Sequence, residues 1–291
     1  MKLLGRVAIA AAVLVVVYGF FVRVGERSWL FEPSPYPVGP WYNQSIYHAQ
    51  DIRFSAPDGN QLDAWWVPTV GPRRTVLFFH SRRGNLSDQA ERIQRLQLLR
   101  SNVFALDYEG YGKSQGQPSL AHMLQDGESA YQYLTTVKKI PPRQIVVEGD
   151  ELGAAVAAAV AARHPQVAAL VMESPFPNIR ALGNAMMPLA GWFMSGDLGV
   201  LKNVRSYPGP KLFLYGGNDA NVPPQLSHQV YAAASAPKME HEWPGATQDH
   251  LVIDAGPSWS RWMETFYVKA KLAPLAPAPR YPKPAVHVGG R

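Results

Sequence analysis

The chain of 291 residues contains no cysteine. Disulfide bonds, zinc sites with thiolate ligands and a cysteine nucleophile are therefore excluded. Charged residues are also sparse, at 17% against 47% hydrophobic residues. This balance is typical of a globular protein with a substantial core, and the length suits one large domain with tails.

The middle of the chain has no net positive charge, although the net charge of the whole chain is +6. Residues 1–30 carry a balance of +3 and residues 269–291 a balance of +5, so the residues between them carry −2. A nucleic-acid-binding domain would gather lysine and arginine on its folded part. The charge distribution therefore argues against nucleic acid as a partner.

One long hydrophobic run lies near the N-terminus. Residues 7–22 carry no charge, and counting from Leu3 reaches the roughly 20 residues that span a bilayer if Arg6 extends to the interface. A cleaved signal peptide is the alternative, but the run ends in YGFFVR, without the small-x-small site that signal peptidase needs. We therefore predict a single-pass membrane anchor over residues 1–28. Lys2 and Arg6 favour an N-terminus inside and a domain outside the cytoplasm.

Proline delimits the folded part. The segment EPSPYPVGP at 32–40 has too many prolines for helix or sheet, which predicts a spacer over residues 29–44. Residues 272–291 contain five more prolines, which predicts a disordered tail. One domain, residues 45–271, remains between them.

Strands and helices alternate through this domain. Residues 51–67 alternate apolar and polar side chains around PDGN at 57–60, which predicts a hairpin. Apolar runs predict buried strands at 74–80, 103–107, 144–148, 168–172 and 211–215, and helices are expected at 87–100, 120–137 and from 152. This pattern predicts an α/β fold with a mostly parallel central sheet, flanked by helices and binding ligands at the carboxyl ends of its strands.

The segment IVVEGDELGAA at 145–155 carries the strongest chemical signal. An apolar strand breaks at Gly149 and restarts as an alanine-rich helix at Leu152. This is the context of a nucleophile elbow, G-x-S-x-G, which presents a serine hydroxyl at a helix N-terminus. Gly149 and Gly153 occupy the glycine positions, but Glu151 occupies the serine position.

Several motifs resemble those of the α/β-hydrolase superfamily. They are LFFH at 77–80 with GNLS at 84–87, FALDYEGYGKS at 104–114, LVMESPF at 170–176 and YGGNDANVP at 215–223. In order and spacing, over roughly residues 45–270, they most resemble the membrane-anchored BEM46/ABHD13-like serine hydrolases. The resemblance implies an α/β-hydrolase fold with a short lid at about 176–207.

The same resemblance implies which residues would form a catalytic triad. Asp219 stands where the family keeps its acid. The segment PGATQDH at 244–250 resembles the family's P-G-A-G-H-N-D, so Gln248 falls at the position of the histidine base. Glutamine cannot act as a base near neutral pH. His250, two residues later, is either a substitute base or a surface histidine.

The predicted oxyanion loop, HSRRGN at 80–85, resembles the family's H-G-N-A-G-N. Ser81 replaces the first glycine, and two arginines enter the loop. A backbone N–H from this loop and one from Leu152 would form the hole if the chain keeps its path. Arg82 and Arg83 are either solvated charges, partners of Glu151 or ligands of an anion.

Glu151 admits three interpretations. It is a lost nucleophile, tolerated where the helix dipole favours an anion and able to occupy the oxyanion hole with its own carboxylate. Alternatively it is a carboxylate nucleophile, as in the haloalkane dehalogenases and epoxide hydrolases, although these carry aspartate and a misplacement of about 1 Å can cost about 10²-fold. A metal site with Asp150, Asp219 and His250 is the third, but no metal-binding spacing supports it.

We favour a membrane-anchored pseudoenzyme with a binding or regulatory role, because the nucleophile and the base positions are both altered. The alternative is a hydrolase of esters or related small apolar substrates that uses Glu151, Asp219 and His250. No cofactor or metal is expected. The lid segment 185–194 is apolar, with three methionines, which suggests a small apolar or acyl ligand, although the lid's own packing explains it equally. The sequence identifies no protein partner.

Overall fold

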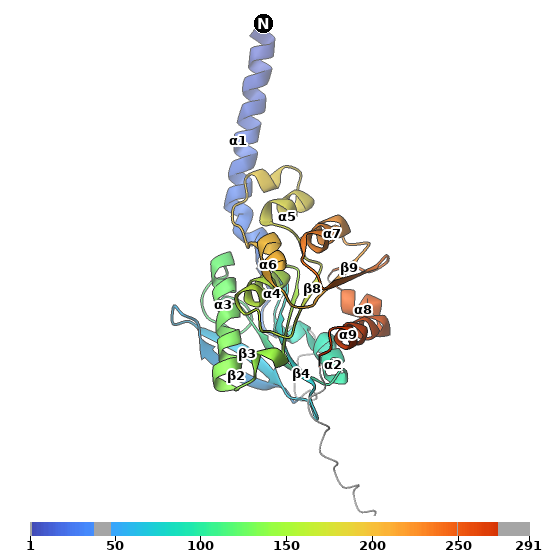
Figure 1. Ribbon diagram of the computed structural model, residues 1–291. Helices are drawn as coiled ribbons and strands as arrows, with labels where there is room; N and C mark the ends of the chain where they lie inside the picture. The colour runs from blue at the N-terminus through green and yellow to red at the C-terminus, as the bar shows by residue number, and fades with distance from the viewer. Residues whose placement is uncertain (1, 38–47, 249, 273–291) are drawn as a thin grey trace, which may run out of the picture.

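A computed structural model describes residues 2–37, 48–248 and 250–272. This part of the chain contains a mixed sheet in the order β10-β9-β8-β7-β4-β6-β3-β2 (Figure 1). β3 pairs antiparallel with β2 and β6, and all other neighbours in the sheet are parallel. The strands are β2 (Gln50–Ser55), β3 (Gln61–Val67), β4 (Arg74–Phe79), β6 (Ser101–Leu106), β7 (Ile145–Asp150), β8 (Ala169–Glu173), β9 (Lys211–Gly216) and β10 (Lys238–Trp243).

Helices cover both faces of this sheet. One face packs against α3 (Leu120–Gln132), α4 (Leu152–Arg163) and α7 (Pro224–Ala233). On the same side, α6 (Val200–Ser206) packs against α4 and α7, and α5 (Ile179–Met186) packs against the short turn that follows it. The other packs against α2 (Ala90–Leu98), α8 (Leu251–Ala255) and α9 (Pro257–Lys269). Successive strand residues enter opposite cores, as Val146 and Val147 do on β7. The inner strands are therefore buried on both faces, which explains their continuous apolar sequences.

The predicted α/β fold with a mostly parallel sheet flanked by helices is confirmed, and so is the hairpin between β2 and β3. The last parallel strand, β10, and the two helices after it were not predicted. Its sequence is KMEHEW, in which only Met239 and Trp243 are apolar. Most of its residues are only half-buried. An edge strand of this kind lacks the apolar run that reveals the inner strands.

The first helix, α1 (Lys2–Leu30), projects from the domain (Figure 1). It is long and apolar enough to cross a membrane. The spacer prediction was wrong at its start, because α1 continues past residue 28 and β1 (Glu32–Pro33) pairs with β5 (Arg83–Gly84). The hydrogen bonds to β5 come from the residues on either side of Pro33: Glu32 N donates to Arg82 O, and Ser34 N donates to Gly84 O. Proline is tolerated at position 33 because no N–H is needed there. The rest of the predicted spacer from residue 38, and the predicted tail from 273, lie outside the described residues.

The second half of α1 packs against the domain along one helical face. Its inward residues include Val22, which is fully buried, and Leu30, which joins the core beneath the lid. The lid consists of α5, the 3₁₀ turn η5 (Ala190–Trp192) and the loop that leads to α6. Tyr18 Oη donates to Pro188 O at 2.5 Å, and Ser195 N donates to Glu26 Oε1 at 2.7 Å. The predicted anchor and the predicted lid are therefore in direct contact.

Candidate functional site

Glu151 forms the turn between β7 and α4. Its φ of 52° and ψ of −107° lie outside the regions that most L-residues adopt, a strain of about 1–3 kcal/mol that the surrounding structure must support. The flanking glycines allow this turn to pack closely. A Cβ on Gly149 would lie 2.1 Å from Gly153 O, and one on Gly153 would lie 2.2 Å from Phe79 O. The segment therefore has the backbone geometry of a nucleophile elbow.

The Glu151 side chain points into the loop that follows β4. Its Oε1 accepts a hydrogen bond from Arg82 Nε at 2.7 Å, and its Oε2 accepts one from the Arg82 backbone N–H at 3.1 Å. Both side chains are only about 1% exposed. The Arg82 N–H belongs to the loop for which the sequence predicts an oxyanion-hole donor, and its hydrogen bond goes to the Glu151 carboxylate. Leu152, the other predicted donor, is the first residue of α4.

Arg82 joins this turn to the end of α1. Its Nη1 donates to Trp29 O at 2.6 Å and to Glu32 Oε1 at 2.8 Å. The backbone carbonyl oxygen of Arg82 accepts a hydrogen bond from Tyr111 Oη at 2.8 Å. The other Glu32 oxygen, Oε2, lies 3.0 Å from Arg83 Nε. Of the interpretations offered for the two arginines, pairing with Glu151 holds for Arg82, whereas Arg83 pairs with Glu32.

Asp219 lies in the loop after β9, near Glu151 but held by its own loop. Its Oδ1 accepts hydrogen bonds from Asn221 N at 2.9 Å and Val222 N at 2.8 Å. Its Oδ2 is buried and makes no hydrogen bond of normal geometry among the described residues, although the nearby Ser174 hydroxyl acts on this carboxyl and lowers its pKa. Burial raises the pKa of Asp219 to about 6, and the charge of Glu151 adds to this shift. The free oxygen is where a histidine would bind in a complete triad.

Gln248 is buried but does not contact Asp219. Its Nε2 donates to both carboxylate oxygens of Asp150, at 3.2 Å each. His250 is exposed, and its side chain makes no hydrogen bond to Glu151 or Asp219 in the described part of the chain. The structure therefore brings Glu151 and Asp219 together but places neither predicted base between them.

Comparison with known proteins identifies the family of this chain. Residues 71–199 match the family described as serine aminopeptidase, S33. The alpha/beta hydrolase domain-containing protein WAV2 of Arabidopsis thaliana is 34% identical over 220 residues, which cover 69% of this chain and 71% of that protein. The chain belongs to the α/β-hydrolase superfamily. Protein bem46 of Schizosaccharomyces pombe is 29% identical over 267 residues, covering 84% of this chain and 87% of that protein.

Solved structures of the superfamily share the fold of this α/β-hydrolase chain. The esterase Pf2001 of Pyrococcus furiosus superposes with a TM-score of 0.69 at 18% identity, covering 82% of this chain and 98% of that one. At this identity the likeness establishes the fold alone. The chemistry of the site must therefore be argued from its own residues.

A buried charge cluster beneath the α/β-hydrolase elbow was not predicted. Arg92 lies 2.7 Å from a Glu173 oxygen, 3.1 Å from a Glu148 oxygen and 3.7 Å from an Asp150 oxygen. Trp259 Nε1 donates to Glu173 Oε1 at 2.8 Å. The signal in the sequence was Glu148, an acidic residue in the middle of an apolar strand. Buried charges need partners, so such a residue predicts a cation on a facing helix, here α2.

One guanidinium cannot neutralise three buried carboxylates. Burial raises the pKa of Glu148 and that of Asp150 above their usual range, although Arg92 opposes both shifts. Burial therefore favours the protonated form of these two carboxyls, and Arg92 favours the ionised form. Gln248 supplies Asp150 with an uncharged hydrogen-bond donor, which is compatible with either state of the carboxyl.

A pocket of about 460 Å³ opens beside the elbow. Its wall combines polar side chains, among them Ser81, Arg83, Asp150, Gln248 and His250, with the apolar residues Leu251, Val252 and Ile253. Glu151 is not among its lining residues. The space is therefore adjacent to the candidate site but does not reach the residue at the nucleophile position.

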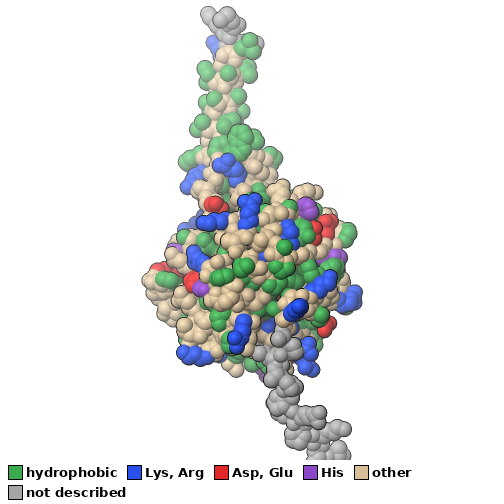
Figure 2. All heavy atoms as spheres, in the orientation of Figure 1, with side chains coloured by type: hydrophobic (Ala, Val, Ile, Leu, Met, Phe, Trp, Pro, Cys, Tyr) green, Lys and Arg blue, Asp and Glu red, His purple; other side chains and the backbone are tan. Residues whose placement is uncertain are grey.

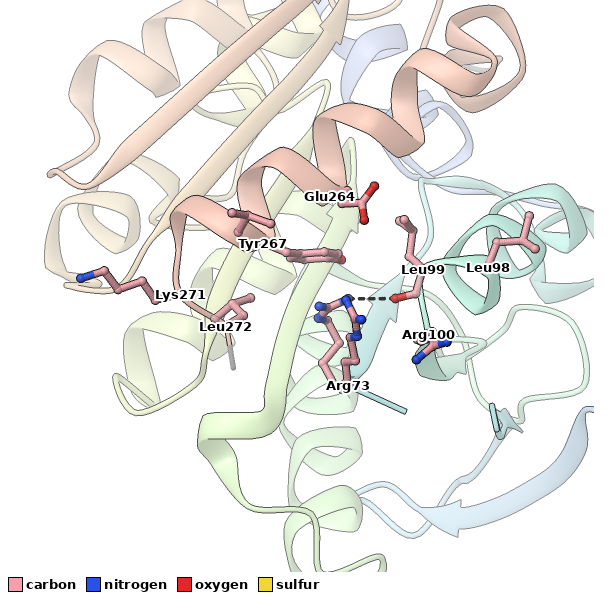
Figure 3. Close-up of a pocket in the computed structure, with 10 residues that line it drawn as sticks. Arg73, Leu98, Leu99, Arg100, Glu264, Tyr267, Lys271 and Leu272 are labelled. Carbon is pink, nitrogen blue, oxygen red and sulfur yellow. Dashed lines mark hydrogen bonds between the residues drawn. The ribbon is translucent and has the colours of Figure 1, made fainter. Parts of the chain in front are cut away.

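A second pocket, of about 600 Å³, lies at the opposite ends of the strands (Figure 3). Arg74 begins β4 there, donates to Leu99 O at 3.0 Å and stacks 3.8 Å from the centre of the Tyr267 ring. Ligands of parallel α/β sheets bind at the carboxyl ends of the strands. We therefore do not assign this pocket to the elbow chemistry.

The described residues bring one group of metal-ligating side chains together. Donor atoms of Asp58, Glu109 and His122 all lie within 4.8 Å of one another. Asn60 Nδ2 donates to both carboxylates, and His122 Nδ1 lies 3.1 Å from Glu109 Oε2. Carboxylate and imidazole ligands of this kind could hold a divalent cation. The group contains none of the four residues of the predicted metal alternative, Asp150, Glu151, Asp219 and His250.

Proposed function

We propose that this chain is a membrane-anchored α/β-hydrolase-fold pseudoenzyme with a binding or regulatory role. The observation that carries the proposal is the buried pair of Glu151 and Arg82. The carboxylate takes both the guanidinium Nε and the backbone N–H that would stabilise an oxyanion. A site whose oxyanion position is filled by its own side chain does not stabilise the transition state of acyl transfer.

The same pair argues against Glu151 as a nucleophile. An attacking carboxylate oxygen needs an open approach to the substrate, whereas Glu151 is about 1% exposed and holds a charge-assisted bond on each oxygen. Attack would require Arg82 to release Glu151. That release would also break its bonds to Trp29 and Glu32 at the end of α1.

The absence of a base is the second support. An ester intermediate on Glu151 needs an activated water for its hydrolysis. Gln248 is an amide that donates to Asp150, and exposed His250 contacts neither Glu151 nor Asp219 in the described part of the chain. Hydrolysis through this site would therefore stop after the first step.

The alternative function is hydrolysis of esters or related small apolar substrates through Glu151, Asp219 and His250. One observation favours it, namely the free and buried Oδ2 of Asp219, which could orient a histidine. In that case the loop around residue 248 must move so that His250 turns inward. His250 is exposed and lines the pocket beside the elbow, so its side chain would turn inward from this pocket.

The proposed ligand site is the pocket of about 460 Å³ beside the elbow. Glu151 itself is about 1% exposed, is paired with Arg82 and does not line this pocket, so the ligand is expected beside the elbow rather than on it. A small ligand with an apolar or acyl part could contact Leu251 and Val252 there, with Arg83 and His250 at its polar end.

The proposed anchor is α1, with the N-terminus inside and the domain outside the cytoplasm. The apolar first half of this helix is exposed, and Lys2 and Arg6 lie at its beginning. Since the chain has no cysteine, a single Leu98→Cys substitution on the exposed side of α2 gives a clean label. A membrane-impermeant maleimide should label it in intact cells, and labelling only after lysis would contradict this orientation.

Enzyme assays test the pseudoenzyme proposal. The purified full-length chain is assayed against p-nitrophenyl esters and small epoxides, beside Glu151→Ala and the control Glu242→Ala at an exposed position. We expect no turnover above the Glu151→Ala background. Turnover that Glu151→Ala abolishes and Glu242→Ala preserves would refute the proposal and support the hydrolase alternative.

A further inference from the structure

We propose that the lid of this protein docks on the surface of an anionic lipid bilayer. The inference rests on the proposed membrane anchor and adds a second contact to it. The docking face has an apolar part next to α1 and a basic part beside it. Its residues are Pro188, Leu189, Trp192 and Phe193 in the apolar part and Arg180, Lys202 and Arg205 in the basic part.

The length of α1 places the lid at the level of the bilayer. The residues from Leu4 to Val17 rise about 21 Å at about 1.5 Å per residue, whereas the hydrocarbon core is about 30 Å thick. The lid contacts begin at the next residue, Tyr18, whose ring lies 5.9 Å from that of Phe193. The membrane must therefore extend to the level of Tyr18 and beyond if α1 is to span it.

The opposite side of α1 supports the same level. At the height of the lid, the helix presents Phe20, Phe21 and Val24 away from the domain, and these side chains are 63–66% exposed. Three adjacent large apolar side chains on a helix are expected to contact lipid rather than water. The lid and these residues flank the same stretch of α1, so both reach the same layer of the membrane.

Two residues of the apolar part of the docking face, Leu189 and Trp192, are largely uncovered by the described residues. Leu189 is 55% exposed and Trp192 is 68% exposed, whereas Ala190 and Met194 of the same lid are buried. Tryptophan is enriched at membrane interfaces because its ring is apolar and its N–H is polar. Trp192 belongs to the 3₁₀ turn η5, and in Figure 1 the lid between α5 and α6, which contains this turn, lies beside α1.

The basic part has the charge expected for an anionic surface. Exposed Arg180, Lys202 and Arg205 line a pocket of about 750 Å³ next to the lid, with Asp197 as its acidic residue. Asp197 Oδ1 accepts a hydrogen bond from Gly199 N at 2.8 Å, so it is engaged in the loop. Figure 2 shows Lys and Arg side chains gathered where α1 meets the domain. Basic residues at this height are attracted to anionic headgroups.

Single-cysteine variants of the full-length chain test the docking. Trp192→Cys, Val13→Cys on the exposed part of α1 and Val70→Cys on the exposed β3–β4 loop are each labelled with NBD. The chain is reconstituted in phosphatidylcholine bilayers with and without phosphatidylglycerol. Quenching by a doxyl-labelled lipid reports lipid contact, and quenching by iodide reports contact with water. Thermal unfolding confirms that each variant is folded.

We expect the label at 192 to behave like that at 13, with strong doxyl quenching and iodide quenching several-fold below that at 70. A label at 192 that matches the one at 70, while the one at 13 remains in lipid, would overturn the docking and leave the anchor intact. Protection from iodide without doxyl quenching would also overturn it, because a protein would then cover the lid. Iodide access at 13 would refute the anchor as well.

The charge of the docking face is tested in the same system. The triple variant Arg180→Glu, Lys202→Glu, Arg205→Glu, carrying the label at 192, should lose doxyl quenching in bilayers with phosphatidylglycerol and lose less without it. Equal quenching of the triple variant and its parent in both bilayers would overturn the role of the basic part.

Discussion

Arg82 Nε lies 2.7 Å from Glu151 Oε1, and both residues are almost completely buried. Arg82 also holds Trp29 O and Glu32, so a single guanidinium connects the turn at the nucleophile position to the end of the proposed membrane anchor. The pair explains how a carboxylate is stable in a buried position built for a serine. It also means that exposing Glu151 and releasing the end of α1 are coupled events.

Removal of Arg82 should destabilise the domain strongly. Arg82→Met leaves the Glu151 carboxylate buried without its partner, and such changes cost about 3–5 kcal/mol in the free energy of unfolding. The double variant Arg82→Met, Glu151→Leu removes both charges and should regain most of that loss. Urea unfolding in detergent, followed by tryptophan fluorescence, measures both. A single variant as stable as wild type would show that the pair is not buried in solution.

The elbow glycine Gly153 should not tolerate a side chain. The Cβ of Gly153→Ala would lie 2.2 Å from the backbone oxygen of Phe79, which cannot move without disturbing β4. We expect a loss of about 1–3 kcal/mol or more in stability. Gly245→Ala is the matched control, because no atom lies within 4 Å of its Cβ, and it should change little. Equal unfolding midpoints for the two variants would contradict the packing described for the elbow.

Asp219 should make the stability of the domain depend on pH. Burial raises its pKa from 3.8 to about 6 in the folded chain. Between about pH 4 and pH 6 the unfolded chain loses this proton while the folded chain keeps it, so folding becomes less favourable as the pH rises. Asp219→Asn removes this effect. Relative to wild type it should gain up to about 3 kcal/mol from pH 4 to pH 7. Unfolding curves with the same pH dependence for both proteins would contradict the raised pKa of buried Asp219.

Serine-hydrolase reactivity should return only when both altered positions are restored. Glu151→Ser supplies the nucleophile and Gln248→His the base, whereas Asp219 is already present. Because a general base contributes about 10²–10⁴-fold, the double variant should react with a fluorophosphonate probe at least about 10²-fold faster than Glu151→Ser alone. Intact mass spectrometry of the labelled protein gives the rates. A folded double variant as inert as the single one would show that the loop path has changed as well.

The sequence predicted the fold well because the α/β-hydrolase pattern depends on local features. Buried parallel strands appear as apolar runs, and the turn at Glu151 is marked by Gly149 and Gly153. The family resemblance also placed Asp219 after a buried strand, and in the structure it lies in the loop after β9, near Glu151. These inferences use neighbours along the chain or strand ends that a parallel sheet brings to one edge.

Contacts between distant segments could not be predicted in the same way. Nothing near Glu32 in the sequence indicates that it would meet Arg82, and the prolines around it suggested a free spacer. The partner of Gln248 depends on the path of a loop, and the structure directs it to Asp150 rather than to Asp219. The cluster around Arg92 depends on which helix faces which strand. Such long-range pairs follow from packing and not from local sequence.

The most direct test of the proposed inactive site is the covalent state of Glu151 after exposure to an electrophilic substrate. A carboxylate nucleophile would open a small epoxide to an ester, and without a base that ester would accumulate. Intact mass spectrometry of the full-length chain after incubation with excess styrene oxide, beside Glu151→Ala, measures this directly. We predict no adduct that depends on Glu151. An added mass of one epoxide per chain, absent from Glu151→Ala, would contradict the account.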